Sequence, residues 1–108
     1  MSQRLDMLER VIAAGSDDPF HWYARAMEFR SLGRLQEAQA AYEAVADRFA
    51  AYVPTYLMAG QLAAELGQTD IARQWLTRGI TAAAKAGDAH AQSELRSALA
   101  ALEGSADA

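Results

Sequence analysis

The chain has 108 residues, of which 52% are hydrophobic, and it carries a net charge of -4 from 14 acidic and 10 basic side chains. This length and apolar content are sufficient for one domain with one core, which excludes a multi-domain organisation. Because the chain has no cysteine, disulfides, thiolate nucleophiles and cysteine-ligated zinc are excluded. Its nine arginines are scattered among the acidic residues, which argues against a basic surface that binds nucleic acid.

The composition favours helix along nearly the whole chain. There are 26 alanines, no asparagine and only two prolines, and alanine loses no side-chain entropy when it enters a helix. The opening residues, MSQRLDMLERVIAAG, mix charged and apolar residues and lack the apolar run of a signal peptide. No stretch comes near the roughly 18 uncharged apolar residues of a membrane span. We therefore expect an all-α, cytoplasmic protein that does not bind a membrane.

Residues 2–14 are predicted to form an N-terminal helix that is apolar on one side only. Its apolar face consists of Leu5, Leu8 and Ile12. Gly15 ends this helix. The next helix begins at Pro19, because the missing N–H of proline costs nothing in a first turn and the preceding Asp18 is a preferred N-cap.

The second helix, from Pro19 to about Leu32, differs from the first because it has two apolar faces. One face consists of Phe20, Tyr23 and Met27, and the other consists of Trp22, Ala26 and Phe29. Such a helix requires neighbours on both sides. Gly33 can adopt a positive φ angle and end it, and a third helix then runs from Leu35 to about Phe49.

Three more helices are predicted in the second half of the chain, at about 54–66, 69–86 and 89–102, and a frayed tail follows at 104–108. Pro54 begins the first of them, Gly67 ends it, and Thr69 is the expected N-cap of the next. The last helix is apolar on one face, like the first helix of the chain. A short helical stack requires this distribution, because its inner helices are covered on both sides while its outer helices turn one face to solvent.

The middle of the chain repeats itself after 34 positions. A shift by this interval places Trp22 on Tyr56, Ala26 on Gly60, Leu32-Gly33 on Leu66-Gly67, Ala38 on Ala72 and Tyr42 on Leu76. The order and spacing of these residues resemble the tetratricopeptide repeat. The resemblance implies a short α-α superhelix of six helices in one domain, 1–108. Its parts are a capping helix at 2–14, repeats at 19–52 and 53–86, a capping helix at 88–103 and the tail.

Two positions depart from the repeat pattern, and one further aromatic residue lies outside it. Arg25 stands where the pattern has leucine, and we expect its stem to cover apolar surface while its charged head lies in solvent. Ala50 stands where the closing proline would fall, so the boundary between the two repeats can shift by a residue or two. Trp75, next to the inward-facing Leu76, is expected to pack against other residues, although an exposed anchor for a partner is the alternative.

The resemblance also implies a concave groove, lined by the first helix of each repeat, that binds a peptide or helix of a partner protein. Transferred to this sequence, the groove residues are Phe20, Tyr23, Met27, Arg30, Leu57, Gln61, Ala64 and Glu65. Their mainly apolar character favours an apolar partner segment. Clamping of carboxylates is not expected, because the chain has no asparagine and only one lysine. The alternative is that these residues simply pack beneath a terminal helix, since such stripes are usually core.

These patterns favour a non-enzymatic interaction module or scaffold. The alternative is structural self-association into a homodimer or longer stack, because two repeats are fewer than the roughly three that usually stand alone. An enzyme is the least favoured class, and neither a cofactor nor a metal is expected, because no catalytic or metal-ligand set is recognisable. Asp17 and Asp18 fit helix capping better than metal binding, and His90 with Glu94 fits a solvated contact.

Overall fold

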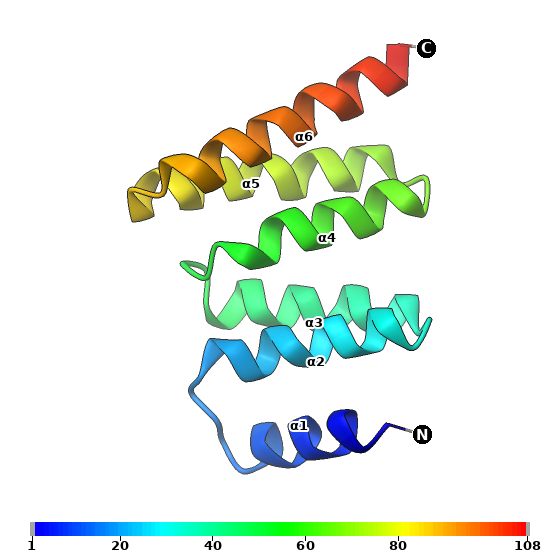
Figure 1. The fold of residues 1–108 in the computed structure, drawn as a ribbon, viewed down its shortest axis with the longest axis vertical. Helices are drawn as coiled ribbons and strands as arrows, with labels where there is room; N and C mark the ends of the chain where they lie inside the picture. Colours follow the sequence, from blue (N-terminus) through cyan, green and yellow to red (C-terminus); the bar gives the residue numbers. More distant parts are fainter. Residues whose placement is uncertain (1, 108) are drawn as a thin grey trace. The chain divides into compact units, whose positions relative to one another are not determined.

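The computed structural model describes residues 2–107, and the side chains of residues 2–104. Six α-helices and no strands occur in this range (Figure 1). They are α1 (Gln3–Ala13), α2 (Pro19–Ser31), α3 (Leu35–Arg48), α4 (Pro54–Glu65), α5 (Thr69–Ala86) and α6 (Ala89–Asp107). Contacts divide the chain into two compact units, Met1–Phe49 and Ala50–Ala108. None of the helices at 2–107 is long and apolar enough to cross a membrane.

The first unit is a hairpin of α2 and α3 with α1 packed against α2. Ala26 and Ala38 are fully buried between the hairpin helices, and such small residues allow two backbones to approach closely. Tyr42 is also fully buried beside them. Gly33 has a φ of 75°, and the N–H of Arg34 donates to the carbonyl of Phe29 at 2.9 Å, which closes the end of α2 as a Schellman turn.

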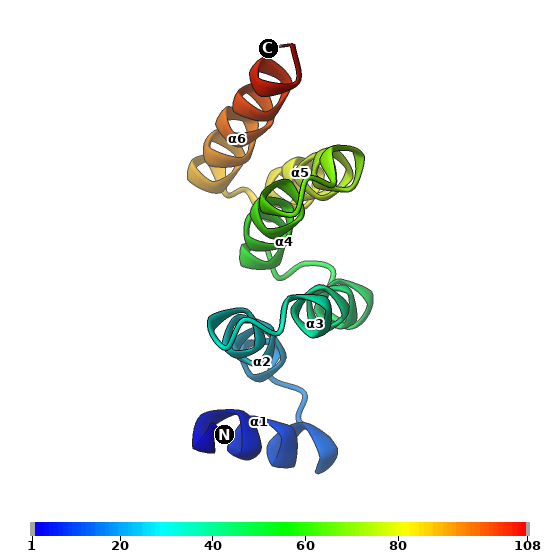
Figure 2. The ribbon, with the colours of Figure 1, turned by 90° about the vertical axis from the view of Figure 1, so that its right-hand side faces the viewer.

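The second unit repeats this hairpin and adds one helix. The α4–α5 hairpin is joined by α6, which packs along α5 and also contacts α4 (Figure 2). The turn after α4 has the same chemistry as the one after α2: Gly67 has a φ of 75°, and the N–H of Gln68 donates to the carbonyl of Ala63 at 2.9 Å. Trp75 is buried, so the prediction that it packs is confirmed.

The ends of two helices differ from their predictions. Thr69 is the first residue of α5, not its N-cap. Gln68 holds the cap position, and its side chain makes no capping hydrogen bond to α5, because the preceding Schellman turn already sets the backbone there. The last helix, α6, continues to Asp107 and includes residues assigned to the tail, of which Ala108 lies outside the described residues. Glu103 accepts a hydrogen bond from Arg73 of α5 at 2.7 Å, which ties these last turns to the hairpin.

The expectation that the charged head of Arg25 lies in solvent is wrong. Its side chain is only 16% exposed, and its Nη1 lies 3.7 Å from the Oε2 of Glu9 on α1. The guanidinium carbon lies 5.2 Å from the centroid of the Trp22 ring. Its Nε is buried and has no hydrogen-bond partner among the residues that the structure describes. The helix α1 and the indole therefore enclose a charge that the sequence pattern assigned to the surface.

Candidate functional site

The predicted groove residues of the first unit all lie on α2, but their environments differ. Phe20 is 51% exposed and is one of the most accessible large apolar side chains of the described range. Tyr23 is half-buried, with its ring 6.4 Å from that of Tyr42 on α3. The sulfur of the half-buried Met27 accepts a hydrogen bond from the Tyr42 hydroxyl at 2.9 Å. Tyr23 and Met27 thus contribute to the α2–α3 hairpin, while Phe20 remains accessible; Arg30 is half-buried.

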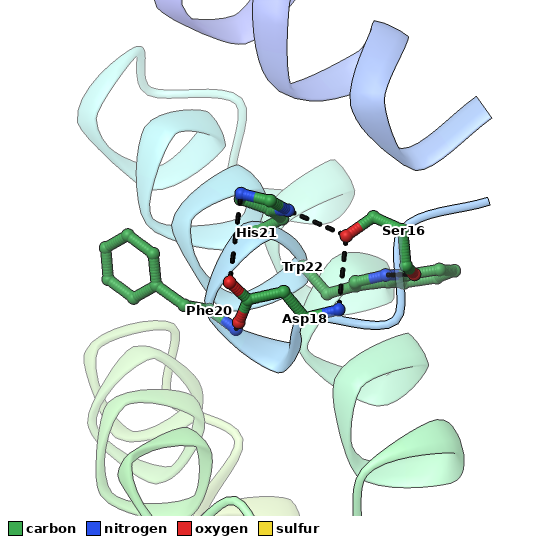
Figure 3. A network of polar contacts seen from close by, with 5 residues as sticks. All are labelled: Ser16, Asp18, Phe20, His21 and Trp22. Carbon is green, nitrogen blue, oxygen red and sulfur yellow. Dashed lines mark hydrogen bonds and ion pairs between the residues drawn. The ribbon is translucent and has the colours of Figure 1, made fainter. Parts of the chain in front are cut away.

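A network of polar contacts fixes the start of α2, where Phe20 lies (Figure 3). Asp18 Oδ1 accepts from the N–H of Phe20 at 2.9 Å, which confirms Asp18 as the N-cap. The Ser16 hydroxyl accepts from the N–H of Asp18 at 3.1 Å and forms a 2.7 Å hydrogen bond with His21 Nδ1. The indole N–H of Trp22 donates to the Ser16 carbonyl at 3.0 Å. The phenyl ring of Phe20 points away from this network.

The network contains a serine, a histidine and an aspartate, but its geometry serves local structure. His21 Nε2 lies 3.9 Å from Asp18 Oδ2, beyond hydrogen-bond distance. The other oxygen of Asp18 caps the helix, and Ser16 Oγ accepts the backbone N–H of Asp18. Sequence reasoning missed this cluster, although the placement of Asp18 three residues before His21, on the same helical face, was a usable signal.

The second unit contains an open groove between α4 and α6, with a volume of about 330 Å³. It is lined by Gly60, Gln61, Ala64, Leu76, Ala98, Ala101 and Leu102, and we call it the α4–α6 groove. The structure therefore brings the predicted residues Gln61 and Ala64 together in one concave site. Leu57 is half-buried and Glu65 is exposed on the same helix, but neither lines the groove. That the two sets of predicted residues form one continuous groove stays a prediction.

Small residues create the space in the α4–α6 groove. Gly60 brings α4 so close to α5 that a Cβ atom there would lie 2.7 Å from Leu76 Cδ2. Ala64 and Ala101 are exposed and leave the groove open above Leu76. Sequence reasoning missed the contribution of α6, because it treated that helix only as a cap. The signal was the additional small side chains beside the leucine stripe of that helix, of which Leu95 is buried.

Charges of both signs lie close in sequence to the lining residues of the α4–α6 groove: Glu103 directly follows Leu102 and accepts a hydrogen bond from Arg73, which lies three residues before Leu76. Glu65 directly follows Ala64, and Glu94 lies one helical turn before Ala98. The helix α4 contains no basic residue. Glu94 Oε1 lies 3.4 Å from His90 Nε2, with both side chains largely in solvent, as expected for a solvated contact. The lining residues themselves carry no charge.

The clearest pKa shifts occur in exposed ion pairs elsewhere. Hydrogen bonds from Arg34 to both carboxylate oxygens, at 2.7 and 2.6 Å, lower the pKa of Glu37 from its ordinary value. The same contact raises the pKa of Arg34. Hydrogen bonds to Glu103 and then Asp70 raise the pKa of Arg73. These pairs stabilise helix ends and surfaces, and the described residues contain no group of three acidic, histidine or cysteine side chains that could hold a metal ion.

Recurring helical hairpins with one turn chemistry and small residues at the helix contact define a helical repeat protein. The chain belongs to the tetratricopeptide repeat family, whose model matches residues 22–51 and 53–85. Folds of this family mediate protein–protein interactions. The family, the all-α class and the stack of helical hairpins predicted from the sequence are confirmed. A comparison with curated protein sequences found no match.

Several solved structures are similar to this chain. The solution structure of a tetratricopeptide repeat domain protein from Salinibacter ruber is 34% identical, with a TM-score of 0.78 over 82% of this chain and 89% of that one. A Bordetella parapertussis protein is 23% identical, with a TM-score of 0.80 over 97% and 91% of the two chains. PcrH, solved in complex with the chaperone-binding region of PopD, is 16% identical, with a TM-score of 0.84 over 93% and 76%. The last two show the fold alone.

Proposed function

We propose that this chain is a non-enzymatic interaction module that binds an apolar peptide segment of a partner protein, with the α4–α6 groove as the centre of the site. The observation that carries the proposal is an open hollow of about 330 Å³ with an uncharged, mainly apolar lining. The α4 side of this groove is lined by Gln61 and Ala64, which the repeat pattern assigns to a partner groove. The likeness to PcrH, which was solved with a bound region of another protein, supports this reading.

The size of the groove limits the affinity. Burying one leucine-sized side chain contributes about 1.5–3 kcal/mol, and association costs at least about 4 kcal/mol in lost translational and rotational freedom. Contacts outside the groove must therefore contribute, and the exposed Phe20 is a further apolar anchor on the first unit. We expect dissociation constants in the micromolar range, or about -8 kcal/mol or weaker.

A matched pair of variants on α6 tests the proposal. Ala101 lines the α4–α6 groove and Ala100 does not, but both are exposed, so phenylalanine at either position adds the same apolar side chain to the same helix. Ala101→Phe is expected to fill the groove and abolish partner capture in a crosslinked pull-down from the native cell. Ala100→Phe is expected to capture the same proteins as the wild type.

Circular dichroism shows whether both variants retain the helical content of the wild type. The proposal is rejected if Ala101→Phe, folded as the wild type is, captures the same partners in the same amounts. Phe20→Ala then measures the contribution of the first unit in the same assay, where a partial loss is expected.

A second candidate function is self-association. Large apolar side chains are exposed on several elements: Met7, Phe20, Leu32, Leu66 and Ile71. Covering such residues with a second copy would add the apolar burial that a two-repeat stack lacks. Light scattering at high micromolar concentration tests this role, and a molecular mass equal to that of the monomer would contradict it.

A further inference from the structure

We propose that a hollow of the first unit, where α1, α2 and α3 meet, binds a neutral primary carboxamide. In this arrangement the amide oxygen accepts from the guanidinium of Arg25, and the amide NH₂ group donates to the carboxylate of Glu9. The inference goes beyond the proposed function, because the two sites share no residue and belong to different units. Three properties carry it: the hydrogen-bonding state of Arg25 and Glu9, the distance between them, and the charge balance of the lining.

The hollow is open to solvent and has a volume of about 250 Å³. Its lining residues are Glu9 of α1, Arg25 and Phe29 of α2, and Glu37, Ala40 and Ala41 of α3, and we call it the α1–α3 hollow. Arg25 and Phe29 lie about one turn apart on one face of α2. Tyr23, which the repeat pattern assigns to the partner groove, lies on a different face of that helix. The space is sufficient for one small planar molecule or one amide side chain.

Arg25 and Glu9 have hydrogen-bonding capacity that no other residue at 2–104 uses. The Arg25 side chain is only 16% exposed, yet its guanidinium makes no hydrogen bond within this range, and its one ion pair there is the contact with Glu9. The Glu9 carboxylate is 46% exposed and likewise makes no hydrogen bond to the described residues. Because the Nε of Arg25 is buried, the terminal Nη atoms are the donors that a ligand can reach.

The distance between the two groups suits a carboxamide. Hydrogen-bonded arginine–carboxylate pairs are about 2.7–2.9 Å apart, so at 3.7 Å Arg25 Nη1 and Glu9 Oε2 are not bonded to each other. A carboxamide has C=O and C–N bonds of about 1.23 and 1.33 Å, which place its oxygen and nitrogen about 2.3 Å apart. Two hydrogen bonds of about 2.9 Å, splayed slightly outward, then reach from these atoms to Nη1 and Oε2. The pair therefore suits a ligand with an acceptor and a donor side by side.

The charge balance of the lining favours a neutral ligand. Arg34 donates to both carboxylate oxygens of Glu37, at 2.7 and 2.6 Å, so the charge of Glu37 is already compensated. The Arg34 guanidinium carbon also lies 4.8 Å from the centroid of the Phe29 ring. An anion that reaches Arg25 is repelled by Glu9, and a cation that reaches Glu9 is repelled by Arg25. A carboxamide has no net charge and meets neither repulsion.

Three probes of nearly the same shape and different charge test the inference. Benzamide is neutral, benzoate is an anion and benzamidine is a cation. Each is titrated into the ¹⁵N-labelled chain of 108 residues, and NMR follows the amide signals of the residues that line the α1–α3 hollow. We expect benzamide to bind in the millimolar range, because an open site of this size encloses only part of the ligand. Benzoate and benzamidine are expected to bind at least about fivefold more weakly.

Two variants with matched controls test the roles of the two charged groups. Arg25→Leu removes the donors and is expected to weaken benzamide binding at least about tenfold, as for the loss of a hydrogen bond to a charged group. Arg10→Leu is its control, since Arg10 is exposed on α1 and does not line the hollow. Glu9→Gln removes the negative charge, so benzoate should bind at least about threefold more tightly and benzamide more weakly. Asp6→Asn, exposed on the same helix, is the control for Glu9→Gln, and both controls are expected to leave all affinities unchanged.

The carboxamide can belong to a small aromatic amide or to a glutamine side chain of a partner protein. N-acetylglutamine methylamide, compared with N-acetylmethionine methylamide, distinguishes the two sources, because both probes have the same backbone amides. A clear preference for the glutamine probe assigns the site to a protein side chain. Benzamide binding without this preference assigns it to a small amide.

Three results would overturn the inference. They are benzoate or benzamidine bound by the wild type as tightly as benzamide, an unchanged benzamide affinity in Arg25→Leu, and no shift of the lining residues with any amide probe at tens of millimolar. None of them concerns the α4–α6 groove, which the Ala101→Phe pull-down tests independently.

Discussion

Gly79 lies at the tightest contact of the second unit, where α5 touches both neighbouring helices. A Cβ atom at this position would lie 2.5 Å from Tyr56 Cβ on α4 and 2.9 Å from Leu95 Cδ2 on α6. Real Cβ atoms do not approach so closely, so Gly79→Ala requires a shift. Leu95 can rotate its side-chain end, but the Cβ of Tyr56 is attached directly to the backbone of α4. The helix itself must therefore move.

The expected free-energy change follows from two opposing effects. Alanine is about 1 kcal/mol better than glycine inside a helix. Overpacking of a core costs about 1–3 kcal/mol, and a clash with a backbone-attached atom belongs at the upper end. The net result is a loss of about 2 kcal/mol in the free energy of unfolding. For a domain of this size, that loss lowers the melting temperature by about 10 °C.

Two other glycines serve as internal controls. At Gly60 the nearest atom to an added Cβ is Leu76 Cδ2 at 2.7 Å, a flexible side-chain end that can move into the α4–α6 groove. Gly60→Ala is therefore expected to be close to neutral. An added Cβ at Gly104 in α6 meets no atom within 4 Å, so Gly104→Ala should stabilise the chain by about 0.5 kcal/mol.

Urea unfolding followed by circular dichroism measures all three variants. The expected order of stability is Gly104→Ala first, then Gly60→Ala, then Gly79→Ala. Unfolding of Gly79→Ala at the same or a higher urea concentration than the wild type would contradict a clash between position 79 and α4. Such a result would mean that α4 moves away from α5 at little cost.

Two further predictions concern arginines of the first unit. The buried Nε of Arg25, which has no hydrogen-bond partner among the described residues, destabilises the folded chain by about 1–3 kcal/mol, and Arg25→Leu removes it. The variant loses a long ion pair with Glu9 and a ring contact with Trp22. We expect urea unfolding to show about 1 kcal/mol of added stability, and a loss of similar size would contradict this. Arg34→Ala removes the hydrogen bonds that lower the pKa of Glu37, so a carbon-detected NMR titration should show that pKa return towards its ordinary value. Because the pKa of Glu37 is lowered in the folded state, its pairing with Arg34 stabilises the chain at pH values above the ordinary carboxyl pKa. This stabilisation disappears as the pH falls through the folded-state pKa of Glu37. A Glu37 pKa that is unchanged in Arg34→Ala would show that Arg34 does not cause the shift.

Much of the fold was predictable because the residues that begin and end its helices act only on the backbone next to them. Proline at the first turn begins α2 and α4, at Pro19 and Pro54. Glycine with a positive φ ends both helices, at Gly33 and Gly67. These effects depend on one backbone position and the two or three residues beside it, so they can be read from the chain directly. The interval of 34 positions then indicates that the same hairpin forms twice.

The candidate site was only partly predictable, because it depends on which helix covers which face. Gln61 and Ala64 follow from the repeat pattern, whereas Ala98 and Ala101 belong to a helix that the pattern describes only as a cap. Tyr23 and Met27 have the same helical spacing as the accessible Phe20, yet they contact Tyr42 on α3. Spacing along one helix identifies an apolar face, but it does not say whether that face meets a neighbour or solvent.

The sequence by itself determined the six helices, the ends of α2 and α4, and the family, since each follows from local backbone chemistry or from a repeated pattern. Only the tertiary structure decided that α1 and Trp22 enclose Arg25 and that α6 completes a groove with α4. These features join residues that are distant in the chain. Their positions are set by side-chain packing between helices, which no short segment of sequence contains.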